Sequence, residues 1–424
     1  MAVGREIRSV NVTCKECHLS GIVVIGAGQA GASLATRLRR SGYEGRITLV
    51  GAEPLPPYQR PPLSKRYLLG EISTESLLLR PTEFYADQAI SLRLGEPVSA
   101  LDPVTRRIRI GDRVLTYDQL ALTTGSVARR LPAGIGGNLA GIHCLRNYSD
   151  VDRMLTDFRK ARRVLIVGGG FIGLEAAAVA AERGLGVTVL ERADRILQRV
   201  VCSETSDYFR NLHAARGVDI REGVGLIRLT GDRHVTGAEL SDGTRLETDL
   251  VIAGIGIEPE TQLARSAGLQ IDNGIATNAY GVTSIAGIWA AGDCASVPHE
   301  GTRLRLESVQ NAVDQAECVA DNMLGAGKPY VPKPWFWSDQ YDVKLQIAGL
   351  SSGYRRLVVR GEERGPRSHW YFGERGLLAV DAMNDPRSFM VARRALQCGI
   401  DVDPQTVADP AVDLKLMLLA DEQQ

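Results

Sequence analysis

The chain has 424 residues, of which 44% are hydrophobic and 24% charged. Its length predicts roughly two to four domains, and its composition is ordinary for a globular protein. Fifty Lys and Arg residues balance fifty Asp and Glu residues, which argues against a nucleic-acid or anionic-membrane binder. No apolar run reaches the roughly 18 residues of a membrane helix, and the N-terminus carries no signal-peptide pattern, so we expect a cytoplasmic protein.

The first dinucleotide-binding signal covers residues 21–53. A short apolar run at 22–25 predicts a buried parallel strand, a helix is expected over 30–40, and a second strand over 47–50. Three glycines between strand and helix complete the pattern G-x-G-x-x-G: Gly26, Gly28 and Gly31. These glycines permit a tight turn and let backbone NH groups approach a pyrophosphate at the helix N-terminus. Glu53, about 20 residues further on, is the acid expected to bind ribose hydroxyls.

A second signal of the same kind begins at residue 162. Strands are expected at 164–167 and 187–190, with a helix over 172–183 between them. The glycines of this copy occupy three positions: Gly168, Gly170 and Gly173. Because each copy lies between a strand and a helix, the sequence predicts two bound dinucleotides in one chain.

The end of this second strand also predicts which nicotinamide cofactor is bound. Glu191 would accept hydrogen bonds from a 2′-hydroxyl and would repel a 2′-phosphate. Arg192 and Arg195 follow closely and weaken this preference without reversing it. NADH is therefore favoured over NADPH.

Two apolar strands distinguish the FAD site from the NADH site. Residues 117–126, YDQLALTTGS, predict a strand that runs into a threonine–glycine turn. Residues 283–295, TSIAGIWAAGDCA, predict a strand at 288–290 that delivers Gly292 and Asp293. The second segment resembles the second FAD motif of flavoproteins with two dinucleotide domains, in which the aspartate binds the ribityl chain. FAD is accordingly assigned to the first glycine motif.

Four segments together resemble the oxygenase-coupled, NADH-dependent ferredoxin reductases: PYQRPPLSK, GGGFIGLEAA, ESVQNAVDQA and PWFWSDQYDVKLQIAG. The similarity covers about residues 21–400 in order. It implies an α/β fold with two Rossmann-like dinucleotide-binding domains, of the glutathione-reductase-like flavoprotein type, followed by a C-terminal α+β domain. The residues alone indicate only two domains and a tail, so the division of the FAD domain into two parts comes from the resemblance.

The domain limits implied by the resemblance are as follows: a flexible N-terminal tail at 1–20, the first part of the FAD-binding domain at 21–123, the NADH-binding domain at 124–250, the second part of the FAD-binding domain at 251–328, and the C-terminal domain at 329–424. The stretch GAGKPYVPKP, rich in glycine and proline, suits the linker before the last domain.

The resemblance implies an FAD-dependent NADH:ferredoxin oxidoreductase. Such an enzyme takes hydride from NADH and passes electrons singly to a two-iron two-sulfur ferredoxin that serves a monooxygenase or dioxygenase. These ferredoxins are acidic, so a basic docking rim is expected, and its candidates are Arg80, Arg129, Arg130, Arg303 and Arg305. We expect a monomer or weak homodimer without a nucleic-acid or membrane partner.

Four residues are assigned to the redox chemistry by this resemblance: Lys65, Glu175, Glu307 and Trp337. Lys65 is expected beside the reactive flavin nitrogen, where a cation stabilises the anionic reduced ring. Glu175 is expected to pair with this lysine and to border the nicotinamide, with Glu307 as a second carboxylate nearby. In PWFWSDQY, Trp337 rather than Trp335 is mapped to the flavin edge nearest the redox partner.

The remaining cofactor contacts implied by the resemblance are Ala30, Val98, Thr124, Gly125, Arg146, Ile172, Gly256, Gly292, Asp293 and Val309. Relatives often carry Asp where this chain has Ala52, so Glu53 is expected to reach the adenosine ribose from a shifted position. No residue is assigned to a metal.

Other functions share part of these features. A rubredoxin reductase or NADH oxidase of the same fold would carry most of the same motifs. A disulfide reductase would place C-x4-C near the flavin, where this chain reads PPLSKRYL without cysteine. Apoptosis-inducing flavoproteins act partly by binding DNA, which the neutral charge disfavours.

The segment CKECH at residues 14–18 has the spacing used for covalent haem attachment. Such attachment takes place outside the cytoplasm, and these residues precede the first FAD strand, beyond the family resemblance. Alone they supply at most three zinc ligands, without a partner pair. We therefore expect a tail without a redox role.

Overall fold

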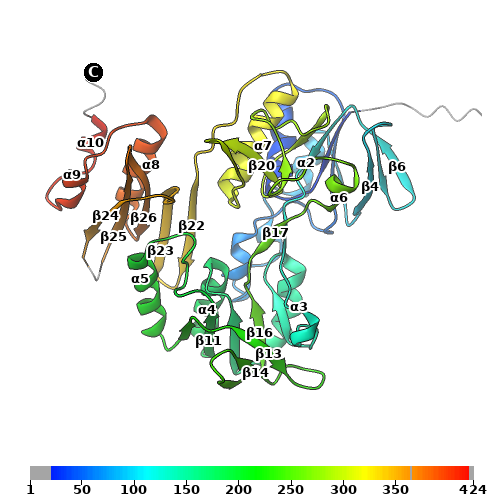
Figure 1. The fold of residues 1–424 in the computed structure, drawn as a ribbon. Helices are drawn as coiled ribbons and strands as arrows, with labels where there is room; N and C mark the ends of the chain where they lie inside the picture. Colours follow the sequence, from blue (N-terminus) through cyan, green and yellow to red (C-terminus); the bar gives the residue numbers. More distant parts are fainter. Residues whose placement is uncertain (1–20, 363–364, 420–424) are drawn as a thin grey trace, which may run out of the picture.

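The computed structural model describes residues 21–362 and 365–419 (Figure 1). The CKECH segment and the predicted N-terminal tail lie outside the described residues. Three five-stranded sheets, two of them parallel and one antiparallel, organise the part of the chain that is described. This architecture confirms the predicted α/β class. None of the helices described is both long and apolar enough to cross a bilayer.

The first parallel sheet carries the first glycine motif and has the strand order β19-β7-β1-β2-β3. Its strands are β1 (Ile22–Ile25), β2 (Ile47–Gly51), β3 (Ile90–Leu94), β7 (Gln119–Leu122) and β19 (Ile288–Ala290). Helices α1 (Gln29–Arg40) and α7 (Val309–Met323) bury Leu34, Leu38 and Val319 in the core beside the sheet. A segment late in the chain thus completes the sheet of the first motif. The short helix α2 (Thr82–Asp87) precedes β3.

The second parallel sheet carries the second glycine motif and has the order β12-β11-β10-β16-β9. Its strands are β9 (Ile142–Cys144), β10 (Arg163–Val167), β11 (Gly186–Glu191), β12 (Asp219–Glu222) and β16 (Leu250–Ala253). The helices of this region are α3 (Tyr148–Phe158), α4 (Phe171–Glu182) and α5 (Ser203–Ala214). Helix α4 is rich in alanine and largely buried, which lets neighbouring backbone approach it closely.

Smaller sheets accompany these parallel sheets. The three-stranded ones are β4 (Val98–Asp102) with β5 (Arg107–Ile110) and β6 (Arg113–Thr116), and β13 (Leu226–Thr230) with β14 (Gly237–Leu240) and β15 (Arg245–Glu247). A mixed one joins β18 (Ile275–Ala276), β20 (Ala295–His299) and β21 (Thr302–Leu304). Strands β8 (Ser126–Ala128) and β17 (Ile257–Pro259) pair where the chain passes between the two parallel sheets. Short helices are η1 (Pro61–Ser64), η2 (Glu75–Leu77), η3 (Ala133–Ile135) and α6 (Gln262–Ser266).

The C-terminal region is an antiparallel sheet of order β22-β23-β26-β25-β24. Its strands are β22 (Trp335–Gln340), β23 (Val343–Gly349), β24 (Arg356–Gly361), β25 (Arg367–Gly373) and β26 (Gly376–Met383), and its helices are α8 (Pro386–Cys398), α9 (Pro404–Ala408) and α10 (Leu416–Leu419). Leu345 and Met383 from the sheet pack with Leu174 and Phe209 of α4 and α5. In Figure 1 this sheet (orange) lies beside the second sheet (green), with β22 nearest the rest of the molecule.

We propose that the domains of the protein have the limits predicted from the sequence, with one adjustment. Strand β16 (Leu250–Ala253) pairs with β10 in the second sheet, so a limit at residue 250 would cut it. We therefore place the end of the NADH-binding domain after Ala253.

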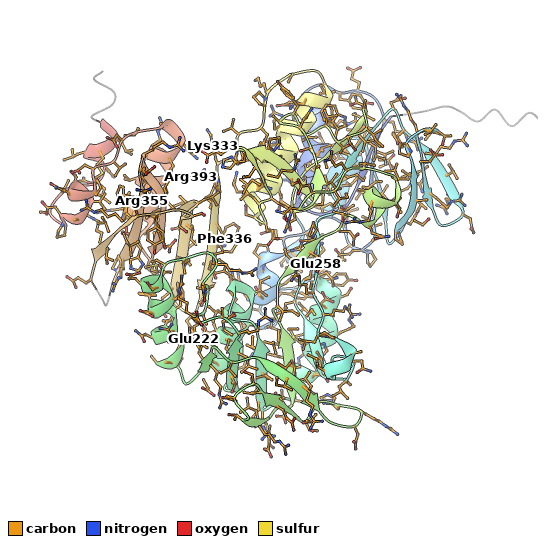
Figure 2. All side chains as sticks on the ribbon, viewed as in Figure 1. Glu222, Glu258, Lys333, Phe336, Arg355 and Arg393 are labelled. Carbon is orange, nitrogen blue, oxygen red and sulfur yellow. The ribbon has the colours of Figure 1, made fainter. Side chains whose placement is uncertain are left out.

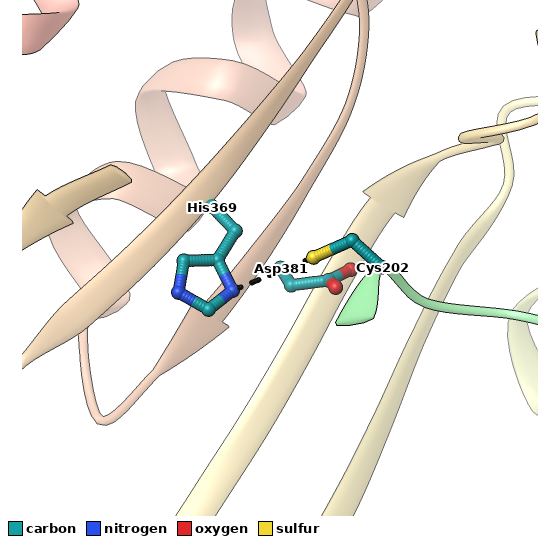
Figure 3. Close-up of side chains that lie close together, drawn as sticks. All are labelled: Cys202, His369 and Asp381. Atoms are coloured by element: carbon teal, nitrogen blue, oxygen red, sulfur yellow. Dashed lines mark hydrogen bonds between the residues drawn. The ribbon is translucent and has the colours of Figure 1, made fainter. Parts of the chain in front are cut away.

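A buried polar cluster joins α5 to the C-terminal sheet (Figure 3). Cys202, His369 and Asp381 place atoms of metal-ligand type within 4.8 Å of one another. The Thr205 hydroxyl lies between them, 2.7 Å from His369 Nδ1, 2.7 Å from Asp381 Oδ2 and 3.3 Å from Cys202 Sγ. Arg367 Nε donates to His369 Nε2 at 2.9 Å, so the neutral ring carries its proton on Nδ1. With neither ring nitrogen available to a cation, we interpret the cluster as a hydrogen-bonded link between α5 and the sheet.

Asp381 makes the stability of this link depend on pH. Burial raises the pKa of its carboxyl to about 7, above the ordinary value near 4. Because the folded-state pKa is the higher one, the stability that this group contributes is complete below about pH 4 and is lost as the pH rises towards about 7. Asp381→Asn cannot ionise, so between these pH values the free energy of unfolding of the wild type should fall relative to that of the variant, by on the order of 3 kcal/mol. Denaturant titrations followed by circular dichroism measure the difference.

Asp112→Asn, in the exposed turn between β5 and β6, is the control and should show no such trend. Parallel pH profiles for the wild type and Asp381→Asn would contradict the role of the buried carboxyl.

Candidate cofactor and redox site

A cavity of about 680 Å³ lies where the first sheet, helix α4 and strand β22 meet. Figure 2 shows Phe336 of β22, one of its lining residues, at this junction. The volume is in the range of cofactor sites, about 300–1,000 Å³. Fifteen of the predicted site residues line it: Gly26, Gly28, Ala30, Glu53, Lys65, Val98, Thr124, Gly125, Arg146, Ile172, Glu175, Asp293, Glu307, Val309 and Trp337. The predicted residues that do not line it are Gly31, Gly168, Gly170, Gly173, Glu191, Gly256 and Gly292.

The first glycine loop has the geometry of a pyrophosphate cradle. A Cβ on Gly26 would lie 2.1 Å from the Thr123 carbonyl oxygen, and one on Gly31 would lie 1.9 Å from the Gly26 oxygen. A Cβ on Gly28 would meet nothing within 4 Å, and this residue faces the cavity. The outer glycines are thus required by packing, whereas the middle one leaves room for a ligand at the start of α1. The residues present fit FAD here.

The second loop repeats this geometry at α4. A Cβ on Gly168 would lie 2.3 Å from the Gly254 oxygen, and one on Gly173 would lie 2.1 Å from the Gly168 oxygen, whereas Gly170 has open space. The Glu191 carboxylate accepts the NH groups of Gly169 and Ala193, both at 2.8 Å, and is thereby held at the loop. This arrangement fits a second dinucleotide with a free ribose hydroxyl.

Arg195, which the sequence placed near this loop, is directed elsewhere. Its guanidinium donates to the carbonyl oxygens of Gln198, Val201 and Cys202 and to the Ser206 hydroxyl. It is thus occupied by contacts within the protein, and Glu191 is the charged group held at the loop.

An ion pair between partly buried Lys65 and buried Glu175 forms the floor of the cavity. Lys65 follows the prolines of η1, and its Nζ lies 3.1 Å from Glu175 Oε1 and 3.1 Å from Asp339 Oδ2. Ser64 Oγ donates to Glu175 Oε2 at 2.6 Å, and Ser338 Oγ donates to Oε1 at 2.8 Å. Burial raises the pKa of Glu175, while Lys65 and the two serine hydroxyls act in the opposite direction. Every polar contact of this carboxylate comes from a group that favours its charged form.

The predicted pairing of Lys65 with Glu175 is present, but its three other partners were not predicted. Ser64 and Ser338 are direct neighbours of Lys65 and Trp337, which the sequence singled out, and Asp339 follows Ser338. Proximity to these motifs was the available signal.

A second charged pair lies at the end of β19. Arg146 Nη2 lies 3.0 Å from Asp293 Oδ2, and the Ser126 hydroxyl donates to the same oxygen at 2.8 Å. Gly292 has a φ of +82°, and its NH donates to Gln315 Oε1 of α7 at 2.8 Å. Helix α7 thereby fixes the turn that presents Asp293 to the cavity, a role for Gln315 that the sequence did not indicate.

Glu53 lies on the cavity wall but is also engaged within the protein. Its carboxylate accepts from Tyr58 Oη at 2.6 Å and from Arg60 at 2.6 Å. Arg60 also donates to the Arg146 carbonyl oxygen. The charge of Glu53 is therefore balanced by Arg60, a partner missed in the sequence.

The aromatic cluster of β22 divides between the cavity and the core. Trp335 packs against Phe389 of the C-terminal core with ring centroids 5.9 Å apart, whereas Trp337 lines the cavity. Phe336 also lines the cavity, and its ring centroid lies 4.7 Å from that of Phe171.

At the mouth of the cavity, exposed Glu307 is bound to Arg305 at 2.5 Å. Gly256 lies outside the cavity, with its carbonyl oxygen accepting the NH of Arg129. Among the docking candidates, Arg80, Arg129 and Arg130 are exposed. Arg303 and Arg305 are partly buried, and both donate to groups within the protein.

Comparison with known proteins agrees with this geometry. Residues 20–316 match the family model for pyridine nucleotide-disulphide oxidoreductases, and residues 335–418 match that for the reductase C-terminal domain. The chain is 42% identical to rhodocoxin reductase of Rhodococcus erythropolis, over 94% of either chain. It is 40% identical to putidaredoxin reductase of Pseudomonas putida, over 94% of this chain and 97% of that one. The crystal structure of the covalent putidaredoxin reductase–putidaredoxin complex matches with a TM-score of 0.91 at 40% identity, covering 96% and 99% of the two chains.

The glycine geometry predicts different outcomes for two matched substitutions. Gly28→Ala should change the free energy of unfolding of the FAD-free protein by no more than about 1 kcal/mol relative to the wild type. It should weaken FAD binding by at least about tenfold, because the methyl group enters the space that the ligand occupies. Gly31→Ala should instead destabilise the FAD-free protein by about 2 kcal/mol or more, because its methyl group meets the Gly26 carbonyl. Thermal unfolding and fluorescence titration with FAD distinguish the two. Equal effects of both variants on stability and on binding would contradict the assignment.

Proposed function

Because the chain belongs to the pyridine nucleotide-disulphide oxidoreductase family, among the oxygenase-coupled ferredoxin reductases, we propose that it is an FAD-dependent NADH:ferredoxin oxidoreductase. The observation that carries this proposal is the position of the pair formed by partly buried Lys65 and buried Glu175 on the cavity lined by the first glycine loop and by the start of α4. FAD, when bound, supplies the change from two-electron to one-electron transfer.

The residues of the cavity have separable tasks in this proposal. Lys65 presents a positive charge, which favours negative charge developing at its side of the cavity. Glu175 holds that ammonium group in place, while Asp339 takes a second of its hydrogen bonds. Phe336 and Trp337 form an apolar wall that excludes water.

The second glycine loop supports NADH as the donor. Glu191 is fixed by two backbone NH groups at the position where a ribose 2′-hydroxyl is bound in this motif. A 2′-phosphate would meet this carboxylate. The helix N-terminus of α4 connects the loop to the cavity, because Phe171, Ile172 and Glu175 of its first turns line the wall.

A two-iron two-sulfur ferredoxin is the electron acceptor that we propose. The solved relative was crystallised as a complex of the reductase with putidaredoxin, and this chain is similar to it over nearly its whole length. Arg80, Arg129 and Arg130 are exposed, and we propose that they meet the acidic partner, with Arg129 also paired to Glu258 at 3.2 Å. We further propose that the enzyme works in the cytoplasm as a monomer or weak homodimer and serves a monooxygenase or dioxygenase through this ferredoxin.

An anaerobic titration tests the cofactor assignment. The purified protein should be yellow, and NADH should bleach its flavin absorption far faster than NADPH. Glu191→Gln should reduce this preference by about tenfold, because it replaces the carboxylate that accepts from the ribose and repels the phosphate. A colourless protein, or an equal response to both nucleotides, would contradict the assignment. In a separate assay in air, a two-iron two-sulfur ferredoxin should be reduced rapidly when NADH is added, whereas transfer of electrons to oxygen alone would indicate an NADH oxidase instead.

If opposite charges guide the ferredoxin to the reductase, salt should slow the reduction of ferredoxin but not the reduction of FAD by NADH. Ferredoxin reduction should slow several-fold as ionic strength rises from about 0.01 to 0.15 M, because screening shortens the Debye length from about 30 to 8 Å. Replacing Arg129 and Arg130 together by Gln should slow it at low salt. Arg245→Gln, on the hairpin of β14 and β15, is the matched control and should have no effect. Stopped-flow rates that are independent of salt would exclude the basic rim.

A further inference from the structure

A line of buried hydrogen bonds leads from Glu175 away from the cavity. Ser338 donates to the carboxylate, and Gln340 Nε2 lies 3.2 Å from Ser338 Oγ. The Gln340 Oε1 atom lies 2.8 Å from His213 Nε2, and the Tyr341 hydroxyl lies 3.2 Å from His213 Nδ1. Ser338, Gln340 and His213 are each 0% exposed, whereas Tyr341 is partly exposed.

The Glu175 carboxylate fixes the direction of every bond in this line. Its ion pair with Lys65 means that its oxygens only accept, so Ser338 gives its single hydrogen to Glu175. The Ser338 oxygen can then only accept, which orients the Gln340 amide with its NH2 group towards the serine. The amide oxygen in turn requires a hydrogen on His213 Nε2. The remaining ring nitrogen, Nδ1, then accepts from the Tyr341 hydroxyl.

Each bond therefore points its donor towards the buried charge. Aligned hydrogen bonds polarise one another, so outer members strengthen the last bond to the carboxylate. Burial lowers the pKa of His213, and Arg216 acts in the same direction, which keeps the ring neutral as the line requires. The line does not conduct protons, because an amide cannot relay a proton without changing its bonding.

We propose that Gln340 and His213 are positioning residues that, through Ser338, hold the Glu175 carboxylate ionised and fixed against Lys65. The line joins three parts of the fold, since Glu175 lies in α4, His213 in α5, and Ser338 and Gln340 in β22. The second sheet and the C-terminal sheet thus jointly set the charge at the cavity floor. The consequence for flavin chemistry rests on the function proposed above, whereas the hydrogen-bond line itself does not.

The charged and titratable groups around the line lie at its two ends. Lys65 and Asp339 lie at the inner end, where Lys65 contacts Glu175 and Asp339 contacts Lys65. At the outer end, the Arg216 guanidinium lies 4.3 Å from the Tyr341 ring centre and pairs with Asp342. Substitutions in the middle of the line leave these groups unchanged, which makes Gln340 and His213 the informative positions.

The test measures the pH at which Glu175 takes up a proton in the FAD-loaded protein. The infrared carbonyl band of the protonated carboxylic acid reports this event and is assigned by its loss in Glu175→Gln. Gln340→Leu and His213→Leu remove the donors and should raise the midpoint by about one pH unit, a tenfold change in the protonation equilibrium. His213→Gln keeps one donor and one acceptor and should restore the midpoint to within about 0.3 units of the wild type.

A matched control separates positioning from stability. Ser368 of β25 is also fully buried, accepts from Trp370 Nε1 and donates to the Ser388 hydroxyl, but does not belong to the line. Ser368→Ala should lower the melting temperature without moving the Glu175 midpoint. An unshifted midpoint in His213→Leu, or an equal shift in Ser368→Ala, would overturn the proposal. If Gln340→Leu fails to fold, the comparison of His213→Leu with His213→Gln tests the proposal.

The measurement also separates this inference from the proposed function. The midpoint requires neither NADH nor ferredoxin. If the variants shift the midpoint but the protein does not reduce ferredoxin, the inference is supported and the proposed function is contradicted. A protein that reduces ferredoxin but shows no shift loses the inference alone.

Discussion

A charged carboxylate that is buried away from water needs hydrogen-bond and ion-pair partners, and this need determines the packing at the centre of this molecule. A buried ion costs several kcal/mol unless partners replace its hydration, and Glu175 is almost completely buried. Its partners are Lys65 and Ser64 from the segment after β2, and Ser338 from β22. These segments must meet at one point for the charge to be stable. The C-terminal sheet must therefore pack against α4 for the floor of the cavity to form.

The C-terminal sheet is thereby more than an appended domain. Strand β22 contributes Phe336 and Trp337 to the cavity wall, and Ser338 and Asp339 to the ion-pair cluster. Its far side is tied to α5 through Thr205, at the centre of the buried Cys–His–Asp cluster. Apolar packing and two separate polar links therefore hold the same sheet against the second parallel sheet, which fits a region whose position determines the charge near the cofactor.

Local features were predicted well from the sequence, because they depend on neighbours along the chain. The strands at 22–25 and 288–290 have the predicted limits, and the helices predicted at 30–40 and 172–183 both begin and end within one residue of the structure. The role of the outer glycines of each motif follows from backbone clashes within their own strand–turn–helix unit or with one adjacent segment, whereas the middle glycine leaves open space. The cavity-facing positions of Lys65, Asp293 and Trp337 followed from the family resemblance rather than from periodicity.

The sequence by itself determined the two glycine loops and the family, since glycine spacing and apolar runs encode backbone geometry over short distances, and it predicted Glu191 as the acceptor for a ribose hydroxyl. Only the tertiary structure decided which groups surround Glu175, that Arg60 balances Glu53, and that a directed line of hydrogen bonds reaches His213. The partners in these contacts belong mostly to elements far apart in the chain. Hydrogen bonds between side chains have no sequence period, so their pairing is fixed only when the sheets pack together.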